Sequence, residues 1–531
     1  MLKNIFFNSF PVKIIFFLAK IYKYSVLHAL LSVFSRAYAN SSFKRFYEAR
    51  MLAPSSGEGS LYWRMLNRLN LFVQEFARKV SPILNDSLLV MGLRGFASSS
   101  FVSNGIIDRY LIKPGLKKLI ILMFALYLPI DHIFRSVGFL NVFASMWDEA
   151  FLIFGLFYTL ARVASSRLPV YPRVTPLDIP ILLFLTTGFF LMCVNAPIFG
   201  IAVSGYRAAA QYILWFFVIS RLIEDESDLN YLVFPILAMG SLTALHGIYQ
   251  FIIGVPIPAG WVSNTELGVR TRVFSIFNSP NIMGAFMVMT APLAAAFAYK
   301  VKNTFLKVAF WALTGIICFS CLVTFSRGAW LGMAAAVLIF ALLRDRRLIA
   351  LIAIAVIVAL FIPDIVNRIT YLFTSDFAEA SARAGRSGRW AIGIDLLVKN
   401  NPWLGFGQGR FGGAVAMQNQ IIEGLDYFYM DNYYLKILIE MGYIGFASFI
   451  ILIFSTAYNG MRSVFRAKAS GKPDILIGIF SGLAGVLIHC LFENILEVPY
   501  MNAYFWGLAA ALVAVGFNFS SPKVFSRKGR L

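Results

Sequence analysis

Apolar runs long enough to cross a lipid bilayer follow one another from Lys117 onward, and they constrain the fold more than any other feature. A transmembrane helix needs about 20 mainly apolar residues. The runs have approximate centres at Ala125, Phe154, Thr187, Trp215, Met239, Met289, Ile316, Val337, Ala355, Phe446, Leu483 and Ala511. Hydrophobic residues are 59% of the 531 residues and charged residues only 14%, too apolar for a water-soluble core. The sequence predicts an all-α integral membrane protein of about twelve transmembrane helices.

Basic residues between the runs predict which side of the membrane each connection faces. The even-numbered connections and the C-terminal tail carry Arg162, Arg167, Arg173, Arg221, Lys300, Lys302, Lys307, Arg344, Arg346, Arg347, Arg462, Arg466, Lys468, Lys472, Lys523, Arg527, Lys528 and Arg530. Cytoplasmic loops carry the excess of Lys and Arg, so both termini are predicted to be cytoplasmic. One long extracytoplasmic loop, at about residues 363–430, then lies between helices 9 and 10. The net charge of +21 reflects these clusters and does not predict nucleic-acid binding.

The chain divides into three regions by composition. Residues 1–115 mix apolar residues with basic and polar ones, which predicts amphipathic helices on the cytoplasmic side. The segment LYWRMLNRLNLFVQEFARKV has a polar face with Arg64, Arg68, Arg78 and Lys79. We expect it to lie on an anionic membrane surface, and a small cytosolic helical domain is the alternative. Residues 116–520 are predicted to form the membrane domain, and residues 521–531 a basic cytoplasmic tail.

A few basic residues fall on the predicted outer side, against the general trend. They are Arg207, Arg270, Arg272, Arg327, Arg383, Arg386 and Arg389. An anionic ligand at the outer leaflet explains such placement, because guanidinium groups match phosphate oxygens. For any single residue, an arginine that snorkels to water is the alternative.

Two short motifs place arginines where apolar runs meet. In RTRVFSIFNSPNIMGAF, Arg270 and Arg272 come before a Pro280-Asn281 break that begins the sixth run. The amides at that helix start can point toward the same outer cavity. In TFSRGAWLG, Arg327 lies in a turn of a few residues between the seventh and eighth runs, near the depth of lipid headgroups.

A third motif, DNYYLKILIEMGYIG, follows the long outer loop. Asn432, Lys436 and Glu440 recur every four residues, so they share one face of the predicted helix. Asp431 comes at the helix start, where the helix dipole favours a carboxylate.

Together these motifs resemble the O-antigen ligase and polymerase family. That family has a Ser-Arg pair after one span and, after its large outer loop, a His-Asn-x-x-Leu-x-x-Leu-x-Glu-x-Gly-x-x-Gly signature. The signature is matched here by Asn432, Leu435, Leu438, Glu440, Gly442 and Gly445. The loop also resembles the family's, in Arg389-Trp390 and in the segment NPWLGFG at residues 401–407. The resemblance covers about residues 117–517 and excludes the N-terminal region.

The resemblance implies a metal-independent membrane glycosyltransferase with no cofactor. Family members use a sugar chain carried on undecaprenyl diphosphate, at the outer face of the bacterial cytoplasmic membrane. The implied partners are this donor, a hydroxyl-bearing glycan or lipid acceptor, and membrane lipid. The residues do not decide between a polysaccharide polymerase and an O-antigen-ligase-like enzyme. A transporter or flippase for lipid-linked sugars, or a nonreactive assembly protein, is the alternative, and only an enzyme changes the covalent product.

The resemblance also suggests residue roles. The family's histidine, which in the ligases assists the acceptor hydroxyl, is Asp431 here. An aspartate can accept the same proton, or it can only cap the helix. Arginine is suited to stabilise a departing diphosphate without a metal. The expected site therefore consists of Asp431 and Arg327 as catalytic residues, with Arg270, Arg272, Arg386, Arg389, Asn281, Asn432, Glu440 and Arg207 as substrate-binding residues.

His489 and Glu493 are a further ionisable pair, four residues apart in the eleventh apolar run. Ionisable residues at membrane depth are costly and mark functional pathways. The pair is predicted either to line the cavity or to satisfy itself between packed helices.

Overall fold

The computed structural model describes residues 115–138, 142–144, 146–165, 174–257, 271–383, 385–420, 429–471 and 473–518, and isolated residues between 61 and 79. Within these ranges every element of regular secondary structure is a helix, as the sequence predicts. The described residues between 61 and 79 are helical and exposed. The rest of the N-terminal region and the basic tail lie outside the described residues, so the predictions made for them are not tested.

Each of the twelve predicted centres lies in a helix. These helices are α7 (Gly115–Ala125), α9 (Trp147–Ser165), α10 (Asp178–Val194), α12 (Trp215–Leu222), α13 (Glu226–Ile253), α14 (Pro280–Lys300), α15 (Thr304–Leu322), α16 (Arg327–Leu343), α17 (Leu348–Ala359), α22 (Tyr433–Ala469), α23 (Asp474–His489) and α24 (Pro499–Asn518). Among the described helices, α13, α14, α15, α22 and α24 are long and apolar enough to cross a membrane. The pair α7 and α8 (Tyr127–Ser136), bent by 64°, gives up to six, and α10, α16 and α23 are shorter apolar helices. The chain is thus a helical membrane protein, and the count of twelve spans stays a prediction.

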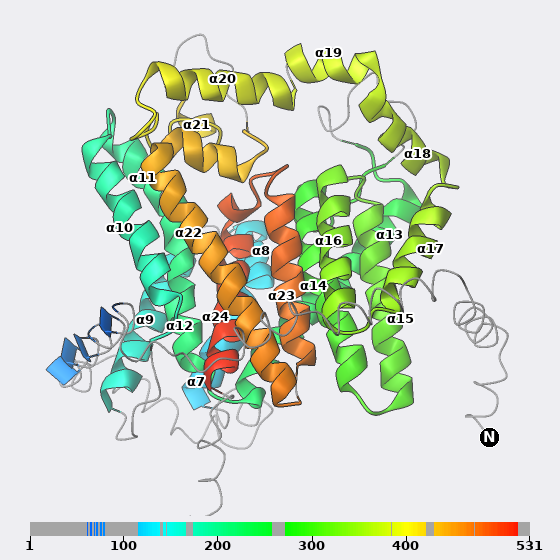
Figure 1. Cartoon of the computed structure of the whole chain (residues 1–531), viewed down its shortest axis with the longest axis horizontal. Coiled ribbons are helices and arrows are strands. Elements are labelled where there is room, and N and C mark those ends of the chain that lie inside the picture. Colours follow the sequence, from blue (N-terminus) through cyan, green and yellow to red (C-terminus); the bar gives the residue numbers. More distant parts are fainter. Residues whose placement is uncertain are drawn as a thin grey trace, which may run out of the picture.

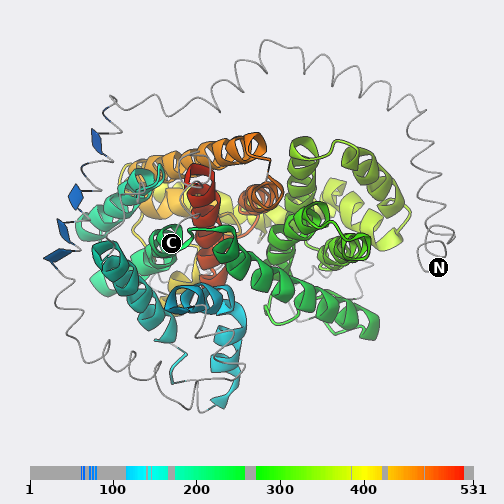
Figure 2. The same ribbon diagram turned by 90° about the horizontal axis from the view of Figure 1, so that it is seen from below.

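Small residues let the central helices pack closely. Helix α14 is almost wholly buried and packs against α15, α16 and α23. A Cβ atom on Gly482 of α23 would lie 2.5 Å from the carbonyl oxygen of Met289, and one on Gly485 would lie 2.6 Å from that of Gly332. Close backbone approach at small residues is how helices associate where lipid removes the hydrophobic driving force. Figure 2 views the bundle from below and shows α24 at its centre, consistent with its buried residues.

Three helices that follow the sequence motifs begin with a side-chain cap. The Ser279 hydroxyl accepts a hydrogen bond from Ile282 N at the start of α14, and Pro280 takes the first helical position. At the start of α16, Ser326 caps in the same way. The Asn432 side chain caps α22 through Leu435 N, at 3.1 Å. Such caps satisfy backbone N–H groups that would otherwise have no partner.

The predicted long loop forms short helices that lie across one end of the bundle (Figure 1). They are α18 (Pro363–Thr370), α19 (Ser375–Arg383), α20 (Arg386–Lys399) and α21 (Ala414–Asn419). The extracytoplasmic placement of this end stays a prediction. The loop is anchored to α22 at a break in that helix. There, Gly442 has φ 62° and ψ −169°, and a Cβ atom on it would lie 2.4 Å from Gly405 N. Only glycine suits such a backbone and so close an approach.

Candidate active site

Arg272 and Asn281 join three separate segments of the chain. The Arg272 Nη2 atom donates to Asn281 Oδ1 at 3.3 Å, and its Nε donates to the Thr324 carbonyl in the α15–α16 turn at 3.1 Å. The Asn281 Nδ2 atom in turn donates to Glu493 Oε2, in the connection between α23 and α24. The first two motifs therefore lie beside the end of the eleventh apolar run.

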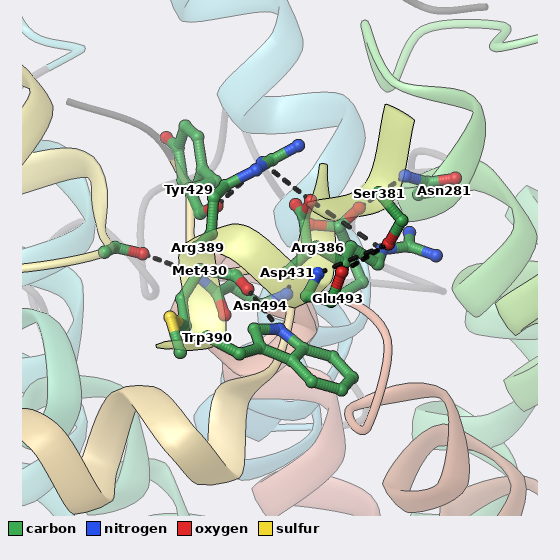
Figure 3. A network of polar contacts seen from close by, with 12 residues as sticks. Asn281, Ser381, Arg386, Arg389, Trp390, Tyr429, Met430, Asp431, Glu493 and Asn494 are labelled. Carbon is green, nitrogen blue, oxygen red and sulfur yellow. Dashed lines mark hydrogen bonds and ion pairs between the residues drawn. The ribbon is translucent and has the colours of Figure 1, made fainter. Parts of the chain in front are cut away.

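Asp431, the first residue of the third motif, is held by two arginines of α20 (Figure 3). Its Oδ2 atom lies 2.8 Å from Arg389 Nη1 and 3.7 Å from Arg386 Nε. The backbone of Asp431 has φ 51°, which is uncommon for a residue other than glycine. Helix α22 is capped by Asn432 and not by Asp431. The Asp431 carboxylate is thus directed to the arginines of the loop.

The segment before Asp431 is fixed by further contacts with α20. Arg389 donates to the Tyr429 carbonyl at 2.9 Å, and the Trp390 indole donates to the Met430 carbonyl at 3.0 Å. The Met430 amide donates to the Gly412 carbonyl at 3.0 Å. These bonds connect the end of the loop to the start of α22, so the position of Asp431 depends on the packed loop as well as on the helix.

Burial shifts the pKa of both carboxyl groups at this site upward. The pKa of Asp431 is raised by burial, and the charges of Arg389 and Arg386 oppose that shift. The pKa of Glu493 is raised to about 7, first by burial and then by the charge of Asp431. Glu493 therefore holds its proton to near neutral pH, because burial and the neighbouring charge of Asp431 both disfavour its ionised form.

Arg327 is the first residue of α16 and is covered by the helices of the loop. Its Nη1 atom donates to the Arg368 carbonyl at 3.3 Å, and its guanidinium lies 5.3 Å from the centre of the Phe377 ring. Arg368 of α18 is only 5% exposed, and its Nε donates to the Phe325 carbonyl at 3.1 Å. Sequence reasoning missed Arg368, because one arginine in a polar loop carries no motif. It braces the turn from which Arg327 extends.

The structure does not bring every expected residue into this cluster. Glu440 is buried and forms an ion pair with Lys436, with 2.9 Å between Oε2 and Nζ. Asn432, Lys436 and Glu440 do share one helix face, but that face points into the protein. Arg207 lies on α11 (Phe199–Ala210), where it pairs with Glu149 of α9 and Gln211. Arg270 lies outside the described residues.

Glu493 was expected within the eleventh apolar run, and the structure places it in the connection after α23. Its carboxylate accepts hydrogen bonds from Asn281 and from the Asn494 amide. His489 ends α23 and packs against Gly328 at the start of α16, where a Cβ atom on the glycine would lie 2.8 Å from the imidazole.

Among the described residues, no three His, Cys, Asp or Glu side chains are placed to hold a metal ion.

These features define a class: a helical, multi-pass membrane protein with a partly buried site of arginines and carboxylates under a helical loop. Residues 308–450 match the family model described as O-antigen ligase. The matched region contains Arg327, the whole loop, Asp431 and the break at Gly442. It confirms the resemblance to the O-antigen ligase and polymerase family, whose members are glycan-transferring enzymes of polysaccharide biosynthesis. A comparison with curated proteins finds no match.

Proposed function

We propose that the protein is a membrane glycosyltransferase that transfers or polymerises an oligosaccharide linked to undecaprenyl diphosphate. The reaction takes place at the outer face of the bacterial cytoplasmic membrane. One observation supports this most: the Asp431 carboxylate lies 2.8 Å from Arg389 under the loop, within the region that matches the O-antigen ligase model. A carboxylate and several arginines are the two kinds of group that such a transfer needs without a metal.

The proposed reaction is one displacement at the anomeric carbon of the donor sugar. The acceptor hydroxyl oxygen forms a bond to that carbon while the bond to the diphosphate oxygen breaks. The diphosphate leaves with the electron pair, and the hydroxyl proton passes to Asp431. A diphosphate is already a good leaving group, so the chemistry needs a base and stabilisation of negative charge.

Arginines supply the charge stabilisation in this proposal. Arg272 binds the Thr324 carbonyl in the α15–α16 turn, Arg327 begins α16 directly after that turn, and Arg270 precedes Arg272 by two residues. They grip the diphosphate, because a guanidinium keeps its charge and its planar fork matches phosphate oxygens. Arg386 and Arg389 hold Asp431 in place, and they also stabilise the negative charge that develops on the departing diphosphate on the side facing the loop.

The raised pKa of Asp431 suits the role of base. A carboxylate accepts a proton more readily as its pKa approaches the operating pH. Burial raises the pKa of Asp431 more than Arg389 and Arg386 lower it. The helix cap at Asn432 leaves the Asp431 carboxylate available for this chemistry.

The topology proposed with this function has the loop outside and both termini in the cytoplasm, and it can be tested by cysteine labelling. Ser387 lies on α20, and Ser470 follows α22 at its other end. With cysteine at each position in turn, an impermeant thiol reagent on intact cells should label Ser387→Cys and spare Ser470→Cys. The reverse pattern would place the loop inside and remove the proposed site from the outer face.

A reconstituted assay tests the reaction itself. Purified protein in liposomes receives a lipid-linked repeat unit, with and without a separate hydroxyl acceptor. A ladder of longer lipid-linked chains identifies a polymerase, and transfer to the separate acceptor identifies a ligase. If the repeat unit crosses the membrane with no new covalent product, the protein is a transporter and the proposal is wrong.

A further inference from the structure

Lys436 forms a buried three-membered ion cluster one helical turn after the proposed base. Its Nζ atom lies 2.9 Å from Glu440 Oε2 and 3.8 Å from Glu497 Oε1. The three side chains are at most 7% exposed. A buried cluster of this kind is weak evidence for stability, because desolvation offsets the attraction between the charges. Its contacts point to another role.

Both carboxylates of the cluster also bind the backbone of the loop. The Phe411 amide donates to Glu440 Oε1 at 3.3 Å, and the Ala414 amide donates to Glu497 Oε1 at 2.8 Å. Between them the packing is tight, since a Cβ atom on Gly413 would lie 2.4 Å from Lys436 Cε. Lys436, Glu440 and Glu497, here called the Lys436 clamp, therefore hold residues 411–414 at two points.

The carbonyl of Gly412, inside the held segment, accepts two hydrogen bonds. One comes from the Met430 amide at 3.0 Å, and the other comes from Asn494 Nδ2 at 2.8 Å. Met430 directly precedes Asp431, and Asn494 directly follows Glu493 (Figure 3). One carbonyl oxygen thus ties together the two segments that carry the carboxyl groups of the site.

We propose that the Lys436 clamp is a positioning device for the reaction: it fixes Gly412 and thereby sets Asp431 and Glu493 side by side. This inference rests on the proposed function. No member of the clamp forms a hydrogen bond or an ion pair with Asp431, so each acts through the backbone of residues 411–414. Glu440 accordingly positions the site and does not bind substrate.

Loosening the clamp changes the electrostatics of the site in a predictable direction. Asp431 faces Arg386 and Arg389 of α20, while Glu493 faces Asn281 of α14 and the charges of Asp431 and Arg386. Burial is the largest cause of the raised pKa in both carboxyl groups. Water that enters a loosened site therefore lowers the pKa of each, and separation from Asp431 lowers that of Glu493 further.

The test compares Lys436→Met with the same change at another lysine that pairs with two carboxylates. Lys117 of α7 lies 2.5 Å from Asp228 and 3.0 Å from Glu224, and none of the three belongs to the site. In nanodiscs, Lys436→Met should speed hydrogen exchange at Phe411, Ala414 and Met430 and lower turnover on the order of 100-fold. Its pH–activity profile should move to lower pH. Lys117→Met should leave all three readouts as in the wild type.

Glu440→Gln keeps the test decisive if Lys436→Met fails to fold. A glutamine oxygen still accepts the Phe411 amide, and Lys436 keeps Glu497 as a partner, so this variant should fold. We expect hydrogen exchange, turnover and the pH–activity profile to change in the same directions as in Lys436→Met, but by smaller amounts. An unchanged pH profile and unchanged exchange in a folded variant would overturn the clamp. Faster exchange in the variant, together with no transfer by the wild type, would instead contradict the proposed function and leave the clamp standing.

Discussion

The Asp178–Arg221 pair and the Asp431–Arg389 pair look alike in sequence, but their surroundings in the structure differ. Asp178 of α10 is fully buried and binds Arg221 of α12 through both carboxylate oxygens, with Thr175 donating to it at 2.6 Å. The side chain of Asp431 is 16% exposed, and it has a left-handed backbone and arginines from a loop. In the first pair, both carboxylate oxygens of Asp178 already accept hydrogen bonds from neighbouring residues. The second keeps part of its surface exposed, and under the proposed function this partial exposure separates a candidate base from a structural ion pair.

Arg327 should show a large effect on activity. Truncating one member of a desolvated charge pair costs about 2–5 kcal/mol. If Arg327 grips the diphosphate, Arg327→Ala should lower turnover by about 30-fold to several thousand-fold while the protein stays folded. Arg327→Lys should recover little, because the planar fork is lost. Steady-state rates in nanodiscs measure this.

The control for this variant is Arg135→Ala, which removes a half-exposed arginine paired with Asp131 on α8. It should keep normal turnover. Normal turnover of Arg327→Ala at equal expression would remove Arg327 from the site.

Arg221→Met should affect stability and spare the chemistry. Removing one partner of a buried ion pair costs about 3–5 kcal/mol, because the remaining charge is left uncompensated. We therefore expect a lower midpoint of thermal unfolding for this variant. Turnover per folded molecule should match the wild type, and a specific loss of turnover would mean that the two pairs are not functionally distinct.

Glu493→Gln should change the pH dependence more than the maximal rate. The pKa of Glu493 is raised to about 7, so the group is neutral below that pH and negative above it. A negative Glu493 opposes the binding of an anionic diphosphate. KM of the wild type should therefore rise as pH increases through about 7, and Glu493→Gln should flatten that rise. A KM profile that is the same in both proteins would show that Glu493 does not face the donor.

The positions of the helices could be predicted from the sequence, because a segment that crosses lipid must be apolar and helical. Every predicted centre lies in a helix, since an apolar run in a bilayer must satisfy its own backbone. The shared face of Asn432, Lys436 and Glu440 also followed from helical spacing. That spacing does not say whether the face meets a cavity or packed protein, and the structure shows packed protein.

The rest of the site depends on contacts between distant segments, which periodicity does not encode. Gly412 binds Met430 and Asn494, and Arg368 reaches Phe325 from the loop. Each contact arises because the loop helices pack across the end of the bundle. The sequence also could not show that Asn432 caps α22 while Asp431 pairs with arginines, because either residue type can cap a helix.

The most direct test of the account is a single-turnover comparison of Asp431→Asn and Asp178→Asn. Donor loaded on the protein in nanodiscs is mixed with acceptor, and release of the lipid diphosphate is followed together with the unfolding midpoint. Asp431→Asn should react on the order of 10²–10⁴-fold more slowly at unchanged stability, because asparagine accepts no proton and Asn432 still caps α22. Asp178→Asn should lose stability and keep its rate. Near wild-type turnover by Asp431→Asn would contradict the central claim that this carboxylate is the base.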